Sequence, residues 1–176
     1  GPLAEPGFVP LMTVVLCFST AFGFVEIGVT AYATERGLPA LAGLLLGLMS
    51  VGSALGGLAY GSRSWRFALV PQFSLLLALM GAGLAVLSFA GHAVAFAALG
   101  FFAGIVMAPV LIVQSMLVAK SVRAEHTAEA FTWSASALLA GVGIGLGAGG
   151  VLLEVYRSNA ALASAAACAL LAALLA

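Results

Sequence analysis

Glu26 is the residue of this chain whose type and position point most directly to chemistry. It is the only charged residue between Phe8 and Ala33, and a carboxylate that far from a charged flank is costly in apolar surroundings. Such acids usually face a bundle interior or a wet cavity, where they mark paths for ions or substrates. Apolar surroundings also disfavour the charged form of a carboxyl group. We therefore predict that Glu26 exchanges protons or attracts a cation; the alternative is a structural glutamate hydrogen-bonded to a neighbouring helix.

Aromatic and amide side chains extend this candidate binding site. Phe18 and Phe22 precede Glu26 by eight and four residues, so a helix places all three on one face, and an acid flanked by aromatic rings suits an amphipathic cation. The alternative for both rings is packing or contact with lipid. Gln114 is the only amide deep in its apolar segment and predicts either a substrate contact or a hydrogen bond between helices. Trp133 is the last candidate, although a tryptophan near a helix end also fits an interfacial belt.

The composition indicates that membrane-spanning elements hold these residues. Of the 176 residues, 64% are hydrophobic and 7% are charged, whereas soluble domains carry about 25% charged residues. The mean hydropathy is +1.23. The six basic residues are scattered, which excludes a nucleic-acid footprint. Cys17 and Cys168 lie in apolar runs and are interpreted as small buried hydrophobes, so neither a metal nor another cofactor is expected.

Charged and turn-forming clusters divide the chain into six apolar segments, each long enough to cross a hydrocarbon core of about 30 Å as a helix. The predicted fold is therefore all-α, a polytopic membrane protein with six transmembrane helices. Residues 1–7 are set aside as a tag remnant or a stretch of a central loop. The predicted spans are 8–33, 38–61, 67–90, 93–119, 127–152 and 160–176.

The distribution of basic residues predicts the orientation in the membrane. The second and fourth connections carry four of the six basic residues, and the other connections carry two. The positive-inside rule then places the second and fourth connections in the cytoplasm, together with the N-terminus. The expected location is the inner (plasma) membrane, crossed several times.

Four features of the sequence, taken in order, carry a family resemblance. Residues 22–37 read FGFVEIGVTAYATERG, residues 52–61 read GSALGGLAYG and precede Arg63 and Arg66, Pro109 lies in the fourth span, and residues 129–133 read EAFTW. They resemble the seventh helix, the second copy of the cytoplasmic loop motif, a helix-ten proline and the start of helix eleven in major facilitator superfamily transporters, and more narrowly in bacterial drug-efflux-like permeases. The resemblance implies that the spans are helices seven to twelve and that an N-terminal half is missing.

The glycine run in the fifth span is similar to the motif that antiporters of this family carry on the pseudo-symmetric helix five. Small residues at every fourth position allow two membrane helices to approach closely. Gly143 and Gly147 form a second stripe, so we expect this helix to contact neighbours on two sides. The residues predicted to mediate helix packing are Gly141, Gly145, Gly149, Gly150 and Pro109.

The resemblance implies half of a secondary active transporter, working by proton-coupled export of small amphipathic compounds through alternating access. Arg63 and Arg66 belong to its cytoplasmic gating loop, and the third and sixth spans, poorest in polar residues, lie at its periphery. The expected partners are the lipid bilayer, the missing half or a second copy, a small-molecule substrate and protons. Two alternatives stay open: an uptake permease for a small polar solute such as a sugar, and a non-transporting scaffold subunit. We expect no enzymatic activity, because no nucleophile–base pair or metal-spaced cluster occurs.

Overall fold

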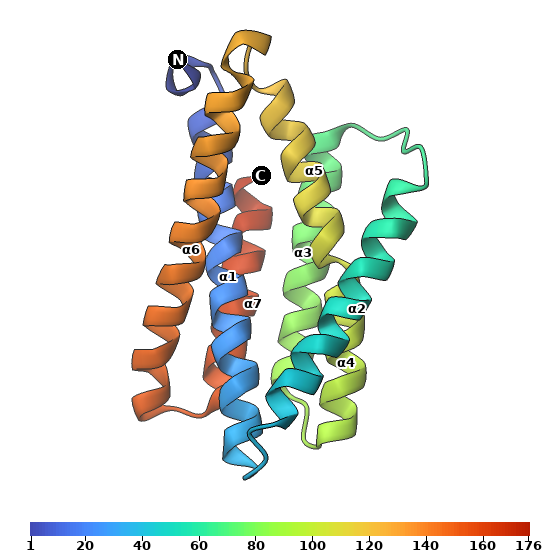
Figure 1. Cartoon of the computed structure of the whole chain (residues 1–176), viewed down its shortest axis with the longest axis vertical. Helices are drawn as coiled ribbons and strands as arrows, with labels where there is room; N and C mark the ends of the chain where they lie inside the picture. Colours follow the sequence, from blue (N-terminus) through green and yellow to red (C-terminus); the bar gives the residue numbers. More distant parts are fainter.

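The computed structural model describes residues 1–176 and consists of helices and short connections (Figure 1). Two 3-10 turns, Pro2–Ala4 and Ala124–His126, lie at the same end of the molecule as the N-terminus. The α-helices are α1 (Phe8–Glu35), α2 (Leu41–Gly61), α3 (Leu69–Ser88), α4 (Ala93–Ile105), α5 (Met107–Lys120), α6 (Thr127–Val155) and α7 (Ser158–Leu175).

Six helical segments are long and apolar enough to cross a membrane, with α4 and α5 forming one of them. The chain is therefore a multi-pass membrane protein, as the sequence predicts, and the observed spans differ from the predicted ones by a few residues. The first span continues to Glu35, where a Schellman motif ends it: Gly37 has φ +70°, its N–H bonds the Thr34 carbonyl, and the Leu38 N–H bonds the Ala33 carbonyl. This C-terminal cap needs a glycine in the left-handed region.

The spans pack in a pattern with internal two-fold character. The first span, α1, packs against α6 and α7, while the fourth span, α4 with α5, packs against α2 and α3; α3 and α7 pack against each other (Figure 1). Exchanging the first three spans with the last three maps this set of contacts onto itself. Because α1 and the α4–α5 span run in opposite directions, the two three-helix units are related as an inverted repeat.

Glycines on both sides bring the paired helices into backbone contact. A Cβ atom at Gly145 of α6 would lie 2.2 Å from the Thr20 carbonyl oxygen of α1. The equivalent pair is alike, since a Cβ atom at Gly52 of α2 would lie 2.2 Å from the Phe101 carbonyl oxygen of α4. No side chain fits at either position, so both pseudo-symmetric contacts depend on a glycine packed against the backbone of the partner helix.

The stripe Gly141, Gly145 and Gly149 is buried against α1, which agrees with the predicted packing role. Gly150 is half-buried near Ile27. Besides α1, helix α6 contacts α5 and α7, but Gly143 and Gly147 of the expected second stripe take no part in this packing. Nothing lies within 4 Å of a Cβ atom built at Gly143 or Gly147, because α6 stands at the edge of the bundle.

The fourth span bends between α4 and α5, where the sequence predicts one helix over 93–119. Buried Pro109 has no N–H to donate to the Ile105 carbonyl, four residues earlier. Gly56 of α2 occupies the space in front of that carbonyl, since a Cβ atom there would lie 1.8 Å from the Ile105 oxygen. The bent segment therefore packs directly against Gly56 of α2.

Candidate functional site

An open groove of about 380 Å³ lies between α1, α2 and α5, and Glu26 lines it. The groove borders the bend of the fourth span, because α5 contributes residues from its first turns. Its other lining residues are Phe22, Val25, Leu46, Met49, Ser50, Ser53, Met107 and Leu111.

The carboxylate of Glu26 has no hydrogen-bond or ion-pair partner in the chain. The side chain is exposed in the groove. The hydroxyl of Thr30 donates at 2.8 Å to the backbone carbonyl of Glu26 and not to its carboxylate. The two ion pairs of the chain both lie at the end of the bundle, around Glu125. The structural alternative, a glutamate bonded to a neighbouring helix, therefore finds no support within this chain.

The rest of the groove is apolar, with two hydroxyls. The hydroxyl of Ser50 donates a hydrogen bond to the Leu46 carbonyl at 2.8 Å. Its oxygen can still accept a hydrogen bond from a ligand. Ser53 lies one turn further along α2 and is half-buried. Methionine side chains adapt to ligands of varied shape, and Met49 from α2 and Met107 from α5 both line this groove. A single acid among apolar and thioether groups suits an amphipathic cation.

Of the two phenylalanines predicted to flank Glu26, only Phe22 lines the groove. Phe18 is 0% exposed and belongs to the core. Its ring lies edge-on to Phe22, with centroids 5.7 Å apart, and edge-on to Phe73 of α3 at 5.9 Å. Phe18 therefore holds Phe22 in place from behind, and the predicted direct role for Phe18 is replaced by a supporting one.

Gln114 forms the inter-helix hydrogen bond that was one of its two predicted roles. The side chain is 2% exposed, and its amide nitrogen donates to the Ser134 hydroxyl of α6. Gln114 does not line the groove of Glu26. The bond ties α5 to α6 about two turns from the connection that joins them, and this role is structural.

Trp133 lies apart from Glu26. Its side chain is 44% exposed and lines a separate groove of about 330 Å³ between the first turns of α1 and α6, with Leu3, Val9 and Met12. This groove has no charged lining residue. The structure therefore does not bring Trp133 and Glu26 into one site, and the position of Trp133 near the start of α6 matches the interfacial alternative.

Exposed hydroxyls are confined to some of the helices. Those of α1, α2, α5 and α6 donate to carbonyls of their own helix, and α3 and α7 have none in their exposed surface. On α3, Ser74 donates inward to the Ala173 carbonyl of α7. In Figure 1, α7 passes behind α1 and α3 passes behind α5. Within this chain the third and sixth spans are more buried than the second and fifth, so their peripheral position in a complete transporter stays a prediction.

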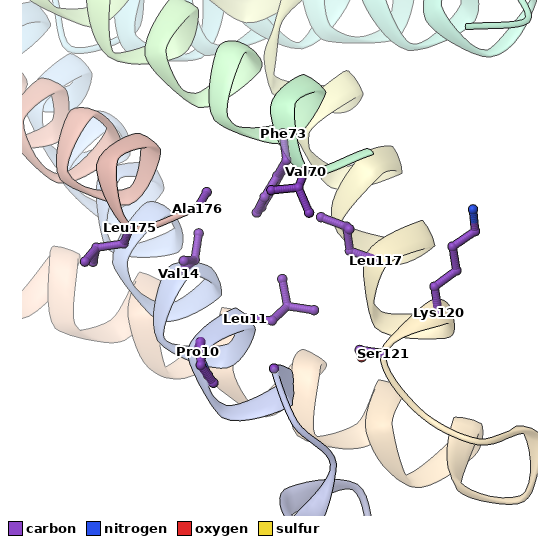
Figure 2. Close-up of a pocket in the computed structure, with 11 residues that line it drawn as sticks. Pro10, Leu11, Val14, Val70, Phe73, Leu117, Lys120, Ser121, Leu175 and Ala176 are labelled. Atoms are coloured by element: carbon purple, nitrogen blue, oxygen red, sulfur yellow. The ribbon is translucent and has the colours of Figure 1, made fainter. Parts of the chain in front are cut away.

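A second cavity, of about 270 Å³, opens at the end of the bundle where both termini lie (Figure 2). The first turns of α1 and α3 and the last turns of α5 and α7 surround it. Leu11, Val70 and Leu117 point into it, and Lys120 points away from the other labelled side chains. The cavity is apolar and holds no acid, so it lacks the chemistry of the Glu26 groove.

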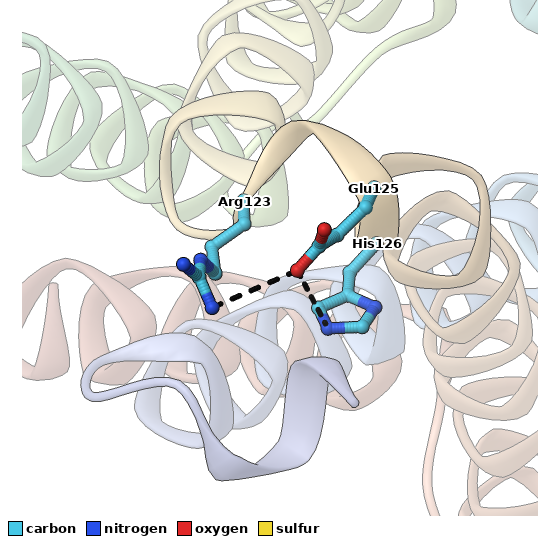
Figure 3. Close-up of polar contacts among 3 residues, drawn as sticks. All are labelled: Arg123, Glu125 and His126. Carbon is cyan, nitrogen blue, oxygen red and sulfur yellow. Dashed lines mark ion pairs between the residues drawn. The ribbon is translucent and has the colours of Figure 1, made fainter.

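The turn before α6 carries a small ionic cluster at the surface (Figure 3). The guanidinium of Arg123 lies 3.6 Å from the Glu125 carboxylate, and the His126 ring lies 3.8 Å from the same carboxylate. Exposed pairs of this kind contribute about 0–1 kcal/mol to stability. The cluster orders the turn, and it is separate from the groove.

Both predicted gating residues, Arg63 and Arg66, are exposed in the connection between α2 and α3. The guanidinium of Arg63 lies 5.5 Å from the centre of the Trp65 ring, and Trp65 stacks on Tyr60. No carboxylate of the chain pairs with either arginine. Sequence reasoning missed this aromatic stack, for which the spacing of Tyr60 and Trp65 was the available signal.

A similar stack at the opposite end of the bundle was also missed. The guanidinium of Arg36 lies 3.6 Å above the Tyr32 ring and donates to the Gly91 carbonyl at 2.9 Å. Tyr32 in turn stacks on Phe96 of α4, with centroids 3.8 Å apart. These contacts hold the connection between α1 and α2 against the connection between α3 and α4.

No family model matches this chain, and no curated protein or solved structure matches it. What the groove does is therefore inferred from its own geometry. That geometry is an unpaired carboxylate in an apolar groove, on a helix that crosses the membrane, beside a bent span.

Proposed function

We propose that this chain is one six-helix half of a secondary active transporter of the major facilitator type, which exports small amphipathic cations in exchange for protons. The observation that carries the proposal is Glu26, an unpaired carboxylate in an open groove 18 residues into a 28-residue membrane helix. An ionisable side chain in such a position is a functional residue by default, because holding a charge within the membrane is costly.

The packing of the six spans supports the same proposal. Two inverted three-helix units are the building plan of each half of this transporter fold, with substrate sites at the repeat interface and on interrupted helices. The groove lies where α1 of the first unit meets the bent span of the second. The apolar outer faces of α3 and α7 suit contact with lipid.

In this proposal, proton exchange at Glu26 couples export of the cation to the entry of protons. The deprotonated carboxylate attracts the cationic group of the substrate from the cytoplasmic side, and the apolar groove receives its hydrophobic part. Protonation from the outer side removes the charge and releases the substrate. The second half of the transporter, or a second copy of this chain, closes the groove, and Arg63 and Arg66 lie in the loop that gates its cytoplasmic side. The N-terminus is then cytoplasmic and the membrane is the inner (plasma) membrane.

Transport in everted membrane vesicles tests the role of Glu26. With an imposed proton gradient, vesicles carrying the complete transporter accumulate a lipophilic cationic dye, and we expect Glu26→Gln to abolish this uptake at unchanged protein level. Glu154→Gln is the matched control, since Glu154 is an exposed acid near the end of α6 outside the groove. Uptake that survives in Glu26→Gln would make Glu26 structural and place coupling elsewhere.

A non-transporting scaffold subunit is the second candidate, favoured by the open glycine positions on α2 and α6. Nothing lies within 4 Å of a Cβ atom built at Gly43, Gly47, Gly143 or Gly147, so these faces are free to receive other helices. Absence of dye uptake across several cations, for both the wild type and the Glu154→Gln control, would support this candidate. A sugar permease fits less well, because the groove offers two hydroxyls and no amide.

A further inference from the structure

The connection between α2 and α3 forms a pocket of about 440 Å³ that shares no lining residue with the Glu26 groove. Two cations line it: Arg63 from the connection itself and Lys120 from the end of α5. No acidic residue lines the pocket, and neither cation has a carboxylate partner in the chain. The pocket therefore presents two uncompensated positive charges at one end of the bundle.

A second, apolar groove of about 300 Å³ continues from this pocket along α3. The two share Tyr60, Trp65, Phe67 and Gln72, so they form one continuous surface. The groove follows α3 away from the connection and toward the middle of the membrane-spanning segment. Leu75 is 61% exposed and Leu79 is 50% exposed along it.

The connection is a built structure with fixed side-chain positions. The indole N–H of Trp65 donates to the Tyr60 carbonyl at 3.0 Å, and the two rings stack with centroids 5.0 Å apart. The side chain of Gln72 is buried. Its amide oxygen accepts a hydrogen bond from the Tyr60 hydroxyl, and its amide nitrogen donates one to the Phe67 carbonyl at 2.6 Å. These contacts hold Arg63 over the aromatic stack, facing the pocket.

Charge and shape together define the molecule that fits this surface. Its anionic group lies between two cations at the membrane boundary, and its apolar part lies in a groove that runs into the membrane. Aromatic rings at the junction favour the level of lipid headgroups. Basic pockets between helices on the cytoplasmic side bind anionic lipid headgroups, and the distribution of basic residues assigns this end to the cytoplasm.

We propose that the surface formed by Arg63, Lys120, Trp65 and the outer face of α3 is a binding site for an anionic phospholipid. The phosphate group of the lipid lies between Arg63 and Lys120, and one acyl chain lies along Leu75 and Leu79. The site is separate from the Glu26 groove, so it stands whether or not the chain transports cations.

Tryptophan fluorescence of the full chain in nanodiscs tests this site. In a Trp133→Phe background, Trp65 is the only tryptophan. Two nanodisc samples are compared, both made of phosphatidylcholine with the same small fraction of a bromine-labelled lipid. The labelled lipid is phosphatidylglycerol in one sample and phosphatidylcholine in the other. We expect the labelled phosphatidylglycerol to quench Trp65 far more strongly, because each cation contributes about a fivefold preference for an anionic headgroup.

Charge variants make the test specific. Arg63→Gln and Lys120→Gln, on two different elements, should each lower the preference for the anionic lipid about fivefold. Arg157→Gln removes the same charge at the opposite end of the bundle and should leave the preference intact. Equal quenching by the two labelled lipids in the wild type would overturn the proposal, as would an Arg157→Gln effect as large as that of Arg63→Gln.

Discussion

Two polar side chains of the membrane-spanning helices have opposite surroundings. Gln114 is buried and hydrogen-bonded to Ser134, whereas Glu26 is left unpaired in a groove. Unsatisfied polar groups in apolar surroundings cost free energy, so a paired side chain is typical of structure and an unpaired one is typical of function. In the sequence, Gln114 and Glu26 both stand out as polar residues in apolar runs. Their surroundings in the structure indicate a structural role for Gln114 and a functional role for Glu26.

The bond between Gln114 and Ser134 gives a prediction at the residue scale. Ser134→Ala leaves a buried amide without its partner and should lower the free energy of unfolding by about 1–2 kcal/mol. The double variant Gln114→Leu/Ser134→Ala should cost less than the sum of the two single variants, because it removes both halves of the bond. Unfolding of the purified chain in mixed micelles, followed by circular dichroism, measures the cycle.

The control for this cycle is Ser136→Ala. Its hydroxyl is exposed and donates only to the Thr132 carbonyl of its own helix at 3.0 Å, so we expect little change in stability. Additive effects of the Gln114 and Ser134 substitutions would show that the bond contributes nothing.

Which residues meet at the site was predictable only in part. Helical spacing alone correctly predicted that Glu26 and Phe22 share a face, because both lie on one helix. The same spacing was wrong for Phe18, since α3 covers that part of α1 with Phe73. Ser50 and Met107 come from other spans, and local sequence holds no information on which distant helices become neighbours.

At the scale of elements, the helix ends were predictable because their signals are local. Gly37 ends α1, and charged or turn-forming residues separate the later spans. Contacts between elements were not predictable in this way. The carboxylate of Glu35 accepts hydrogen bonds from the Ser158 N–H at 2.7 Å and the Ser158 hydroxyl at 2.9 Å, joining the end of α1 to the start of α7. Nothing in either segment identifies the other as its partner.

Glycine contacts between α1 and α6 give a prediction for an element pair. Gly145→Val places side-chain atoms where a Cβ atom alone would lie 2.2 Å from a carbonyl oxygen. The helices must separate, and we expect a loss of stability of about 1–3 kcal/mol or more. Gly147→Val adds the same side chain to the same helix in open space, so it should leave the melting temperature of the detergent-solubilised chain nearly unchanged. Equal losses for the two variants would contradict backbone contact at Gly145.

For the whole molecule, the number of spans and their helical nature followed from composition, because a chain this apolar has few other ways to satisfy its backbone. The inverted arrangement of the two three-helix units required the structure. It depends on glycine contacts such as Gly23 with Gly145, Gly52 with the Phe101 backbone and Gly104 with the Met49 backbone, and these glycines resemble many others in the sequence.

The exposed groove and the open glycine faces give a prediction for the molecule as a whole. If the chain is half of a transporter, as proposed above, it leaves uncovered the surface that the other half would bury, and membrane helices associate through close contact at small residues. We therefore expect the isolated chain to self-associate in detergent, and the variant Gly47→Val/Gly147→Val to do so less while keeping its melting temperature. Light scattering on the purified chain measures this. A monodisperse monomer for the unmodified chain would show that these faces do not bind a second copy, and would leave a separate six-helix half as the proposed partner that covers the groove.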